Sequence, residues 1–353
     1  MIRFCAPRAP ASQTGLTLVE LMVALALGMV ITGAVLSLFL SSSQSAREDE
    51  QYRLKMESGR YAANLLRNEL RMVDFWGMVV SIDDIVTSLT PTSGGCADTL
   101  GLMNQGQALL LNDGHDSTST PQFTACAAMT TNQVAGTDQL VIKKVTSEPT
   151  ARAIVDRADL DGDGDTGETL TLGASDLETG VVYLRATATD GRIIADASSA
   201  NAPALGESDW RLDTRAYFIR DHFRQVGDGI PSLCRLSTVG TGLGNVETST
   251  VDQAECLVPG IQDFNIELGL DTDNNGTVDR YTETPSVSEM ERAVSARISV
   301  LARAQRPITG YQNSKTYRLG MGTFRGPYND GFYRSLFSVT VALRNPINLS
   351  RLR

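Results

Sequence analysis

The sequence contains little histidine, with only His115 and His222 among its 353 residues. Two imidazoles leave little material for histidine-based metal sites, catalytic triads or acid–base pairs. The GxSxG, Walker-type and HExxH motifs are also absent from the sequence. Each histidine is expected to be a surface or structural residue, and the chain is predicted not to be an enzyme.

Basic residues are scarce relative to acidic ones. Lys and Arg total 31 against 41 Asp and Glu, for a formal net charge of −10. The cations Lys143, Lys144, Arg344, Arg351 and Arg353 are too few to follow a phosphate backbone, so no direct binding of nucleic acid is expected. Apolar residues make up 42 %, enough to build a core in one large domain or two ordinary ones.

Cysteine is also limited to five residues, and none forms a CxxC pair, which argues against a zinc site or a redox dithiol. Cys5 lies near the N-terminus, and the other four are Cys96, Cys126, Cys234 and Cys256. Four cysteines allow three pairings, or four free thiols if the compartment is reducing. We favour Cys96–Cys126 and Cys234–Cys256 because each pair closes a local loop, of 29 and 21 intervening residues.

A long apolar segment covers residues 16–40 and carries one charged residue, Glu20. As a helix it would be roughly 37 Å long, enough to cross a bilayer core of about 30 Å. Arg3 and Arg8 precede it, and the next basic residue is Arg47. This distribution predicts a single span with its N-terminal end in the cytoplasm. An ordinary signal anchor has the same hydropathy, but a carboxylate inside the span costs about 2.5–3.5 kcal/mol near the bilayer centre.

The residues Gly15-Leu16-Thr17-Leu18-Val19-Glu20, followed by this apolar run, resemble the class III signal of type IV prepilins and type II secretion pseudopilins. The resemblance implies that a prepilin peptidase cuts after Gly15 and methylates the new N-terminus at Leu16. Glu20 would then pair with the free amine of a neighbouring subunit in the filament core. That contact would neutralise two charges that are costly when apart.

After the apolar run, the sequence predicts a second, amphipathic half of the same helix over residues 41–77. Apolar residues recur at helical spacing, namely Leu54, Tyr61, Leu65, Leu66, Leu70 and Val73. Gly77 is the expected stop. We therefore divide the chain into a leader (1–15), a transmembrane or filament-core helix (16–40), the amphipathic half (41–77) and a periplasmic head (78–353).

The head is predicted to be rich in β-strands. Short alternating segments separated by polar turn residues indicate strands at 107–112, 139–145, 181–188, 215–220, 264–270, 296–303 and 336–343. Residues 86–137 and 189–212 are expected to be largely irregular. The predicted fold class is α+β, with a long helix packed on a mostly antiparallel sheet with long loops.

Segments of the stem end and of the head resemble the PilW family of minor pilins. They are SGRYAANLLRNELRMVDFWG (58–77), RAYFIRD (215–221), IPSLCRLS (230–237), the long stretch at 256–281, ARISVLAR (296–303), YRLG (317–320) and YRSLFSVTVALRN (333–345). The resemblance implies a minor pilin that takes part in starting or tipping type IV pili, which support motility, adhesion or DNA uptake. Its partners would be other minor pilins, the major pilin, a PilY-type tip adhesin, prepilin peptidase and the inner-membrane assembly platform. It would sit in the inner membrane as a single-pass protein before entering the fibre.

Two other identities remain open at this point. A type II secretion pseudopilin shares the stem and the cleavage signal. A membrane-anchored, calcium-dependent adhesin would instead keep an uncut leader. The mass of the mature protein therefore separates this hypothesis from a cleaved pilin.

Two acidic loops place oxygen side chains at alternate positions, as the first half of a calcium-binding EF-hand loop does. The loops contain Asp271, Asp273, Asn275, Thr277 and Asp279 in one case, and Asp159, Asp161, Asp163 and Asp165 in the other. Neither loop has Glu at position 12, although Glu283 closely follows the loop that begins at Asp271. No cofactor is expected to be required. Calcium is the candidate ligand, and a solvated Asp/Asn/Gly turn is the simpler alternative.

Overall fold

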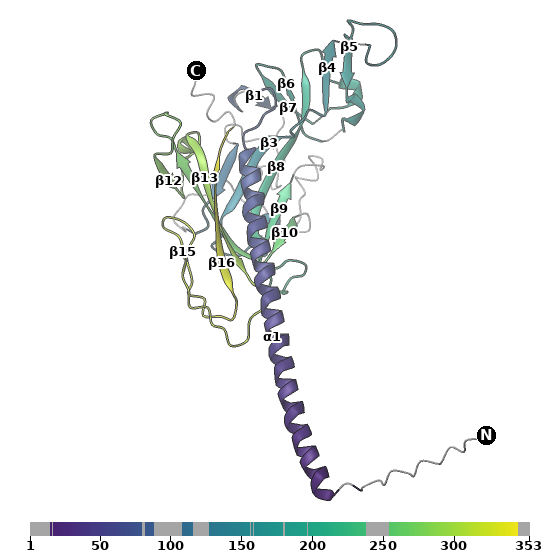
Figure 1. The fold of residues 1–353 in the computed structure, drawn as a ribbon. Helices are drawn as coiled ribbons and strands as arrows, with labels where there is room; N and C mark the ends of the chain where they lie inside the picture. The colour runs from purple at the N-terminus through teal and green to yellow at the C-terminus, as the bar shows by residue number, and fades with distance from the viewer. Residues whose placement is uncertain are drawn as a thin grey trace, which may run out of the picture. The chain divides into compact units, whose positions relative to one another are not determined.

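The computed structural model describes residues 15, 17–79, 82–87, 108–115, 127–155, 157, 159–178, 181–195, 197–237 and 254–344. The chain divides into two compact units, one ending at Gln51 and one beginning at Tyr52. Figure 1 shows the long helix α1 (Leu18–Arg71) and the strands of the second unit. Helix and sheet together confirm the predicted α+β class.

Helix α1 ends six residues before the predicted stop at Gly77, which corrects that boundary. The N–H of Met72 donates to the carbonyl of Glu69, which tightens the last turn. Asp74 then adopts a left-handed conformation with φ 63°, and its N–H donates to the carbonyl of Lys143 in the sheet. The backbone therefore contacts the sheet at Asp74, before Gly77.

The described strands form three sheets, and every pair is antiparallel except β1 with β7. The largest sheet has the order β1-β7-β6-β8-β3-β2, and β4, β5, β9 and β10 join it at the side. The second sheet has the order β12-β11-β13-β16, and β14 pairs with β15 as a hairpin. The strands are β1 (Ile85–Thr87), β2 (Leu109–Asn112), β3 (Gln139–Val145), β4 (Ala151–Val155), β5 (Thr169–Leu172), β6 (Tyr183–Ala186), β7 (Gly191–Ile194), β8 (Ser208–Arg220), β9 (Ser232–Ser237), β10 (Glu255–Pro259), β11 (Ile261–Leu270), β12 (Arg280–Thr282), β13 (Ala293–Arg303), β14 (Tyr317–Arg318), β15 (Phe324–Arg325) and β16 (Arg334–Ala342). Short helical turns are η1 (Ile82–Asp84), α3 (Ala127–Thr130), η2 (Ala174–Asp176), η3 (Ser199–Asn201) and α5 (Val287–Met290).

The prediction of irregular structure at 189–212 is wrong in two places. Strand β7 occupies Gly191–Ile194, and β8 begins at Ser208, seven residues before the predicted start at 215. β8 is long because it pairs with four strands, β3, β4, β6 and β9. The polar residues of β8 are stabilised by these cross-strand neighbours. The alternation of apolar and polar residues alone therefore did not reveal the first part of the strand.

The second unit has one main core that joins both large sheets to the C-terminal part of α1. Leu66 and Leu70 are fully buried with side chains from the two sheets, such as Phe218 and Phe264. A buried ion-pair network adds to this contact, because Glu69 of α1 accepts a 3.0 Å hydrogen bond from Lys144 Nζ and pairs with Arg215. Leu66, Leu70 and Val73 of the predicted stripe are therefore part of the face that α1 buries against the sheets, whereas Tyr61 is 56 % exposed, which corrects the prediction at that position.

Strand β11 carries apolar and polar side chains on alternating positions, yet both sets are buried. Phe264, Ile266 and Leu268 enter the core. Asp263, Asn265 and Glu267 are also buried. The segment around the β14–β15 hairpin covers this polar face. Arg325 Nε donates to Asp263 at 2.6 Å, and the N–H of Met321 donates to Glu267 at 2.9 Å.

Cys234 and Cys256 form a disulfide, as the sequence favoured. They lie directly opposite each other on β9 and β10. The other predicted pair, Cys96 and Cys126, lies outside the described residues. A cross-link of this loop length limits the unfolded chain and typically contributes about 2–4 kcal/mol.

We expect the double change Cys234→Ala/Cys256→Ala to lower the free energy of unfolding by about 2–4 kcal/mol. Urea unfolding of the full chain in detergent, under non-reducing conditions, measures the difference. Cys5→Ala is the matched control and is expected to have no effect. An unfolding midpoint that is unchanged in the double variant would contradict the prediction.

Candidate functional site

The start of α1 is held by a reciprocal set of hydrogen bonds between Thr17 and Glu20. The N–H and the hydroxyl of Thr17 each donate to Glu20 Oε2 at 3.0 Å, and the N–H of Glu20 donates to Thr17 Oγ1 at 3.2 Å. This is a capping box, in which a Thr and a Glu three residues apart satisfy two free N–H groups. The spacing Thr-x-x-Glu was itself the signal, and the interpretation of Glu20 as an assembly carboxylate overlooked it.

Gly15 precedes this box, and Leu16 lies outside the described residues. The apolar residues that follow are exposed along the helix, with Leu18 at 76 % and Phe39 at 68 %. Within the described part of the chain, α1 is the one helix whose length and composition allow it to cross a membrane. An apolar run of this length is stable next to lipid or next to other apolar helices.

The second acidic loop connects β11 to β12 and brings three of its predicted ligands together. Carboxylate oxygens of Asp271, Asp273 and Asp279 lie within 4.8 Å of one another. The Asp271 carboxylate accepts the N–H groups of Asn275 at 3.1 Å and Gly276 at 2.8 Å. Gly276 has φ 85°, a conformation that glycine adopts without strain.

The two ends of this loop are joined through Asp279. The hydroxyl of Thr272 donates to Asp279 Oδ2 at 2.6 Å, and the N–H of Thr272 donates to the same oxygen at 2.7 Å. Both bonds lower the pKa of Asp279, because they stabilise its charged form. Thr277 donates its N–H to Asn275 Oδ1 at 2.7 Å, so these two predicted ligands are already bonded to each other.

The first acidic loop connects β4 to β5 and is exposed. Oxygens of Asp159, Asp161 and Asp163 lie within 4.8 Å of one another, whereas the fourth predicted ligand, Asp165, lies outside that group. The N–H of Asp165 donates to Asp163 Oδ1 at 2.9 Å, and the N–H of Gly164 donates to Asp159 Oδ1 at 3.1 Å. Both loops therefore gather carboxylates, and both also satisfy them with their own backbone.

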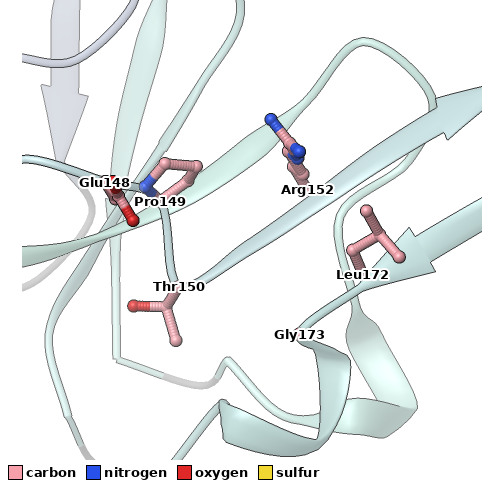
Figure 2. A pocket seen from close by; sticks show the side chains of 6 residues that line it. All are labelled: Glu148, Pro149, Thr150, Arg152, Leu172 and Gly173. Atoms are coloured by element: carbon pink, nitrogen blue, oxygen red, sulfur yellow. The ribbon is translucent and has the colours of Figure 1, made fainter.

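A hollow of about 380 Å³ lies near the same two strands (Figure 2). Glu148, Pro149, Thr150 and Arg152 line one side, and Leu172 and Gly173 line the other. A Cβ at Gly173 would lie 2.1 Å from the carbonyl oxygen of Thr150, so only glycine fits there. None of the predicted site residues lines this hollow.

The structure reveals a buried charge cluster around His115, which the sequence described only as a surface or structural histidine. His115 Nδ1 lies 2.7 Å from Asp138 Oδ1, and Nε2 lies 3.0 Å from Asp263 Oδ2. Burial alone would lower the pKa of His115, but Asp113, Asp138 and Asp263 raise it to about 11. His115 is therefore a cation that links the segment after β2 to the segment before β3 and to β11.

His222 is buried as well, and its Nδ1 lies 2.6 Å from an oxygen of its neighbour Asp221. Both histidines thus have structural partners. Asp113 is a near neighbour of His115, but Asp138 and Asp263 lie 23 and 148 residues away in the sequence, which is why no local pattern indicated the cluster.

Two family models match this chain. Residues 216–345, from the end of β8 to just beyond β16, match the model described as type IV pilus-assembly protein W. Residues 10–36, which include Gly15 and Glu20, match a prokaryotic N-terminal methylation motif. A comparison with curated proteins gave no match, and one with solved structures gave none either.

These matches cover the N-terminal motif and most of the head segments on which the predicted resemblance rests, and they confirm it; the segment at 58–77 lies outside both. The domains of this family are structural, and the absence of enzymatic activity stays a prediction. The apolar helix with its prepilin-type start fits a membrane-anchored protein. The chain is similar to the PilW family over residues 216–345, and the two matches together identify it as a type IV pilus-related pilin.

Proposed function

We propose that this protein is a minor pilin that takes part in starting type IV pili, in a priming or tip complex with other minor pilins. The observation that carries the proposal is the combination of two features in one chain. A methylation motif begins an exposed apolar helix, and a PilW-type β head follows it. A protein built in this way acts by association, because its apolar stem is stable only among lipids or other stems.

In the proposed assembly, stems bundle side by side and each head supplies lateral contacts. The amine created at Leu16 would lie near a Glu20 carboxylate of an adjacent subunit, so that neither charge is left alone in an apolar core. The partners would be other minor pilins, the major pilin, a PilY-type tip adhesin, prepilin peptidase and the inner-membrane assembly platform.

The head is proposed to lie in the periplasm before it reaches the fibre. Two observations support this placement. Arg3 and Arg8 stand before the span, as expected for its cytoplasmic end. The head also contains the Cys234–Cys256 disulfide, and disulfides persist in oxidising compartments.

The test is the mass of the mature protein, together with the pili of a strain that lacks it. We expect protein from its native host to begin at methylated Leu16, and we expect the deletion strain to make the major pilin but few pili. Restoring the gene with a Gly15→Val change is the control, because the leader should then stay attached and piliation should stay low. A mature protein that still begins at Met1 would contradict the proposal.

A pseudopilin of type II secretion is the second candidate, because the methylation motif is compatible with it. Under that function, the deletion strain would keep normal pili and lose secretion of exoproteins. Electron microscopy of the cells and assay of the culture medium therefore separate the two.

Calcium binding by the acidic loops stays a prediction. We expect 5–10 mM calcium, about ten times a typical extracellular dissociation constant, to raise the melting temperature of the full chain by a few degrees. Asp271→Asn should reduce this shift, and magnesium at the same concentration serves as the control. A melting temperature that does not respond to calcium would remove the idea.

A further inference from the structure

One lysine of α1, Lys55, lies on the face of the helix that is buried in the second unit. Ser58 and Gly59, on the same face, are buried as well. The Lys55 side chain is 4 % exposed, and its Nζ lies 4.4 Å from the centroid of the Tyr52 ring and 5.9 Å from that of the Tyr333 ring. Tyr52 is 51 % exposed, so the ammonium group is held at the edge of the buried face, next to solvent.

The charge of Lys55 is not balanced within the chain. Among the described residues, no carboxylate forms an ion pair or a hydrogen bond with Lys55. The neighbouring charge that acts on it is Lys315, which is also a cation. Burial and Lys315 both lower the pKa of Lys55, because both disfavour its charged form. Lysine is rarely buried without a carboxylate, so Lys55 indicates that another molecule supplies the anion.

The same helix carries unpaired acidic groups shortly before Lys55. Asp49 and Glu50 are exposed, and neither forms an ion pair within the described part of the chain. α1 runs without a break from Leu18 to Arg71, with about 100° and about 1.5 Å per residue. Glu50 therefore lies about 7.5 Å before Lys55 along the axis and about 140° around it. The two groups of one chain cannot pair across the helix, whereas groups of two chains can.

Two parallel stems in the same orientation face each other with opposite sides of the helix. A side chain on the first stem therefore meets a side chain that lies about halfway around the second stem, and Lys55 and Glu50 come close to this condition. A second copy that is moved by five residues, about 7.5 Å, toward the C-terminal end of α1 brings its Glu50 level with Lys55 of the first copy.

The proposed pairing at the N-terminus requires a displacement of nearly the same size and in the same direction. The amine at Leu16 of the displaced copy becomes level with Glu20 of the first copy after a shift of four residues. The difference between the two shifts is one residue, about 1.5 Å, which the flexible four-carbon stem of lysine can span. An interface between different faces with an axial shift does not close into a ring, so it continues as a helical filament.

We propose that Lys55 binds Glu50 of a second copy of this chain, displaced by about five residues along parallel stems. This contact rests on the proposed function, in which stems bundle side by side, and it adds a charged contact to the apolar ones. The two tyrosine rings already hold Lys55 in place, so little side-chain entropy is lost when the carboxylate binds.

The test measures association of the mature protein, purified from its native host and reconstituted in phosphatidylcholine liposomes. Energy transfer is recorded between copies that carry a donor or an acceptor at the C-terminus, and we expect transfer between wild-type copies. Lys55→Glu and Glu50→Lys should each weaken the association about tenfold or more, because each places like charges together. The double variant Lys55→Glu/Glu50→Lys exchanges the positions of the two charges, so it should recover most of the transfer.

Arg53→Glu is the matched control, because it reverses an exposed charge of the same helix, and it should leave the transfer unchanged. Lys55→Met separates the contact from folding. Methionine keeps an unbranched side chain and removes the unpaired cation, so this variant should melt at the same or a higher temperature in detergent and still lose the association.

Four results would overturn the proposal. They are no transfer between wild-type copies, full transfer in Lys55→Glu (as expected if an inorganic anion occupies the site), no recovery in the double variant, and an equal loss in Arg53→Glu. The experiment measures only the contact between copies. The deletion strain tests the proposed function independently, so the two proposals can fail separately.

Discussion

Glu20→Gln is expected to leave the protein in the membrane and to abolish its incorporation into pili. Glutamine is nearly the same size as glutamate and can still accept hydrogen bonds from Thr17 in the capping box. It carries no charge, so the amine of a neighbouring subunit would lose its partner inside the apolar core. Leaving one charge of a buried pair unbalanced costs about 3–5 kcal/mol, which lowers an association constant at least about 100-fold.

Glu20→Ala is the matched comparison, because it removes both the charge and the capping box. Loss of a cap costs about 0.5–2 kcal/mol, less than the unpaired amine. Both variants should therefore be equally absent from pili sheared from the cells and equally present in the membrane fraction, as measured by immunoblot. If Glu20→Gln enters pili like the wild type and only Glu20→Ala fails, the carboxylate acts as a helix cap and the assembly role is wrong.

His115→Ala is expected to lower the free energy of unfolding by about 3–5 kcal/mol, because removing one partner leaves buried charges uncompensated. Asp138 and Asp263, both about 1 % exposed, lose the imidazolium that lies between them. Urea unfolding of the full chain in detergent, followed through the fluorescence of the buried Trp76 and Trp210, measures the change.

His222→Ala is the control for this experiment. His222 is equally buried, but its partner Asp221 is exposed, so the loss should be about 1 kcal/mol or less. Similar losses in the two variants would mean that the His115 cluster contributes no more than an ordinary surface pair.

The same cluster predicts how stability depends on pH. The folded protein raises the pKa of His115 to about 11, against about 6.5 in the unfolded chain. A raised pKa contributes stability that is complete below about pH 6.5 and is lost as the pH rises towards 11. Between pH 7 and 9 the wild type should therefore lose up to about 1.4 kcal/mol per pH unit from this group. His115→Ala should show a flatter profile, and parallel profiles would contradict the assignment.

Some features follow from local sequence alone. The apolar run with its Thr-x-x-Glu start fixes where α1 begins, since period, cap and charge all act within one turn. Strand β3 coincides with the predicted 139–145 because its apolar residues are continuous. The Cys234–Cys256 disulfide followed from proximity along the chain. Local signals were sufficient where an element is stabilised by its own residues.

Other features were decided by the tertiary structure. The alternation on β11 is what a strand with one solvated face would show, yet Asp263, Asn265 and Glu267 are buried because a distant hairpin covers them. The end of α1 depends on a hydrogen bond from Asp74 to β3, and the charge of His115 depends on carboxylates up to 148 residues away. Desolvation and pairing of charges depend on distance in space, which a single sequence does not encode locally.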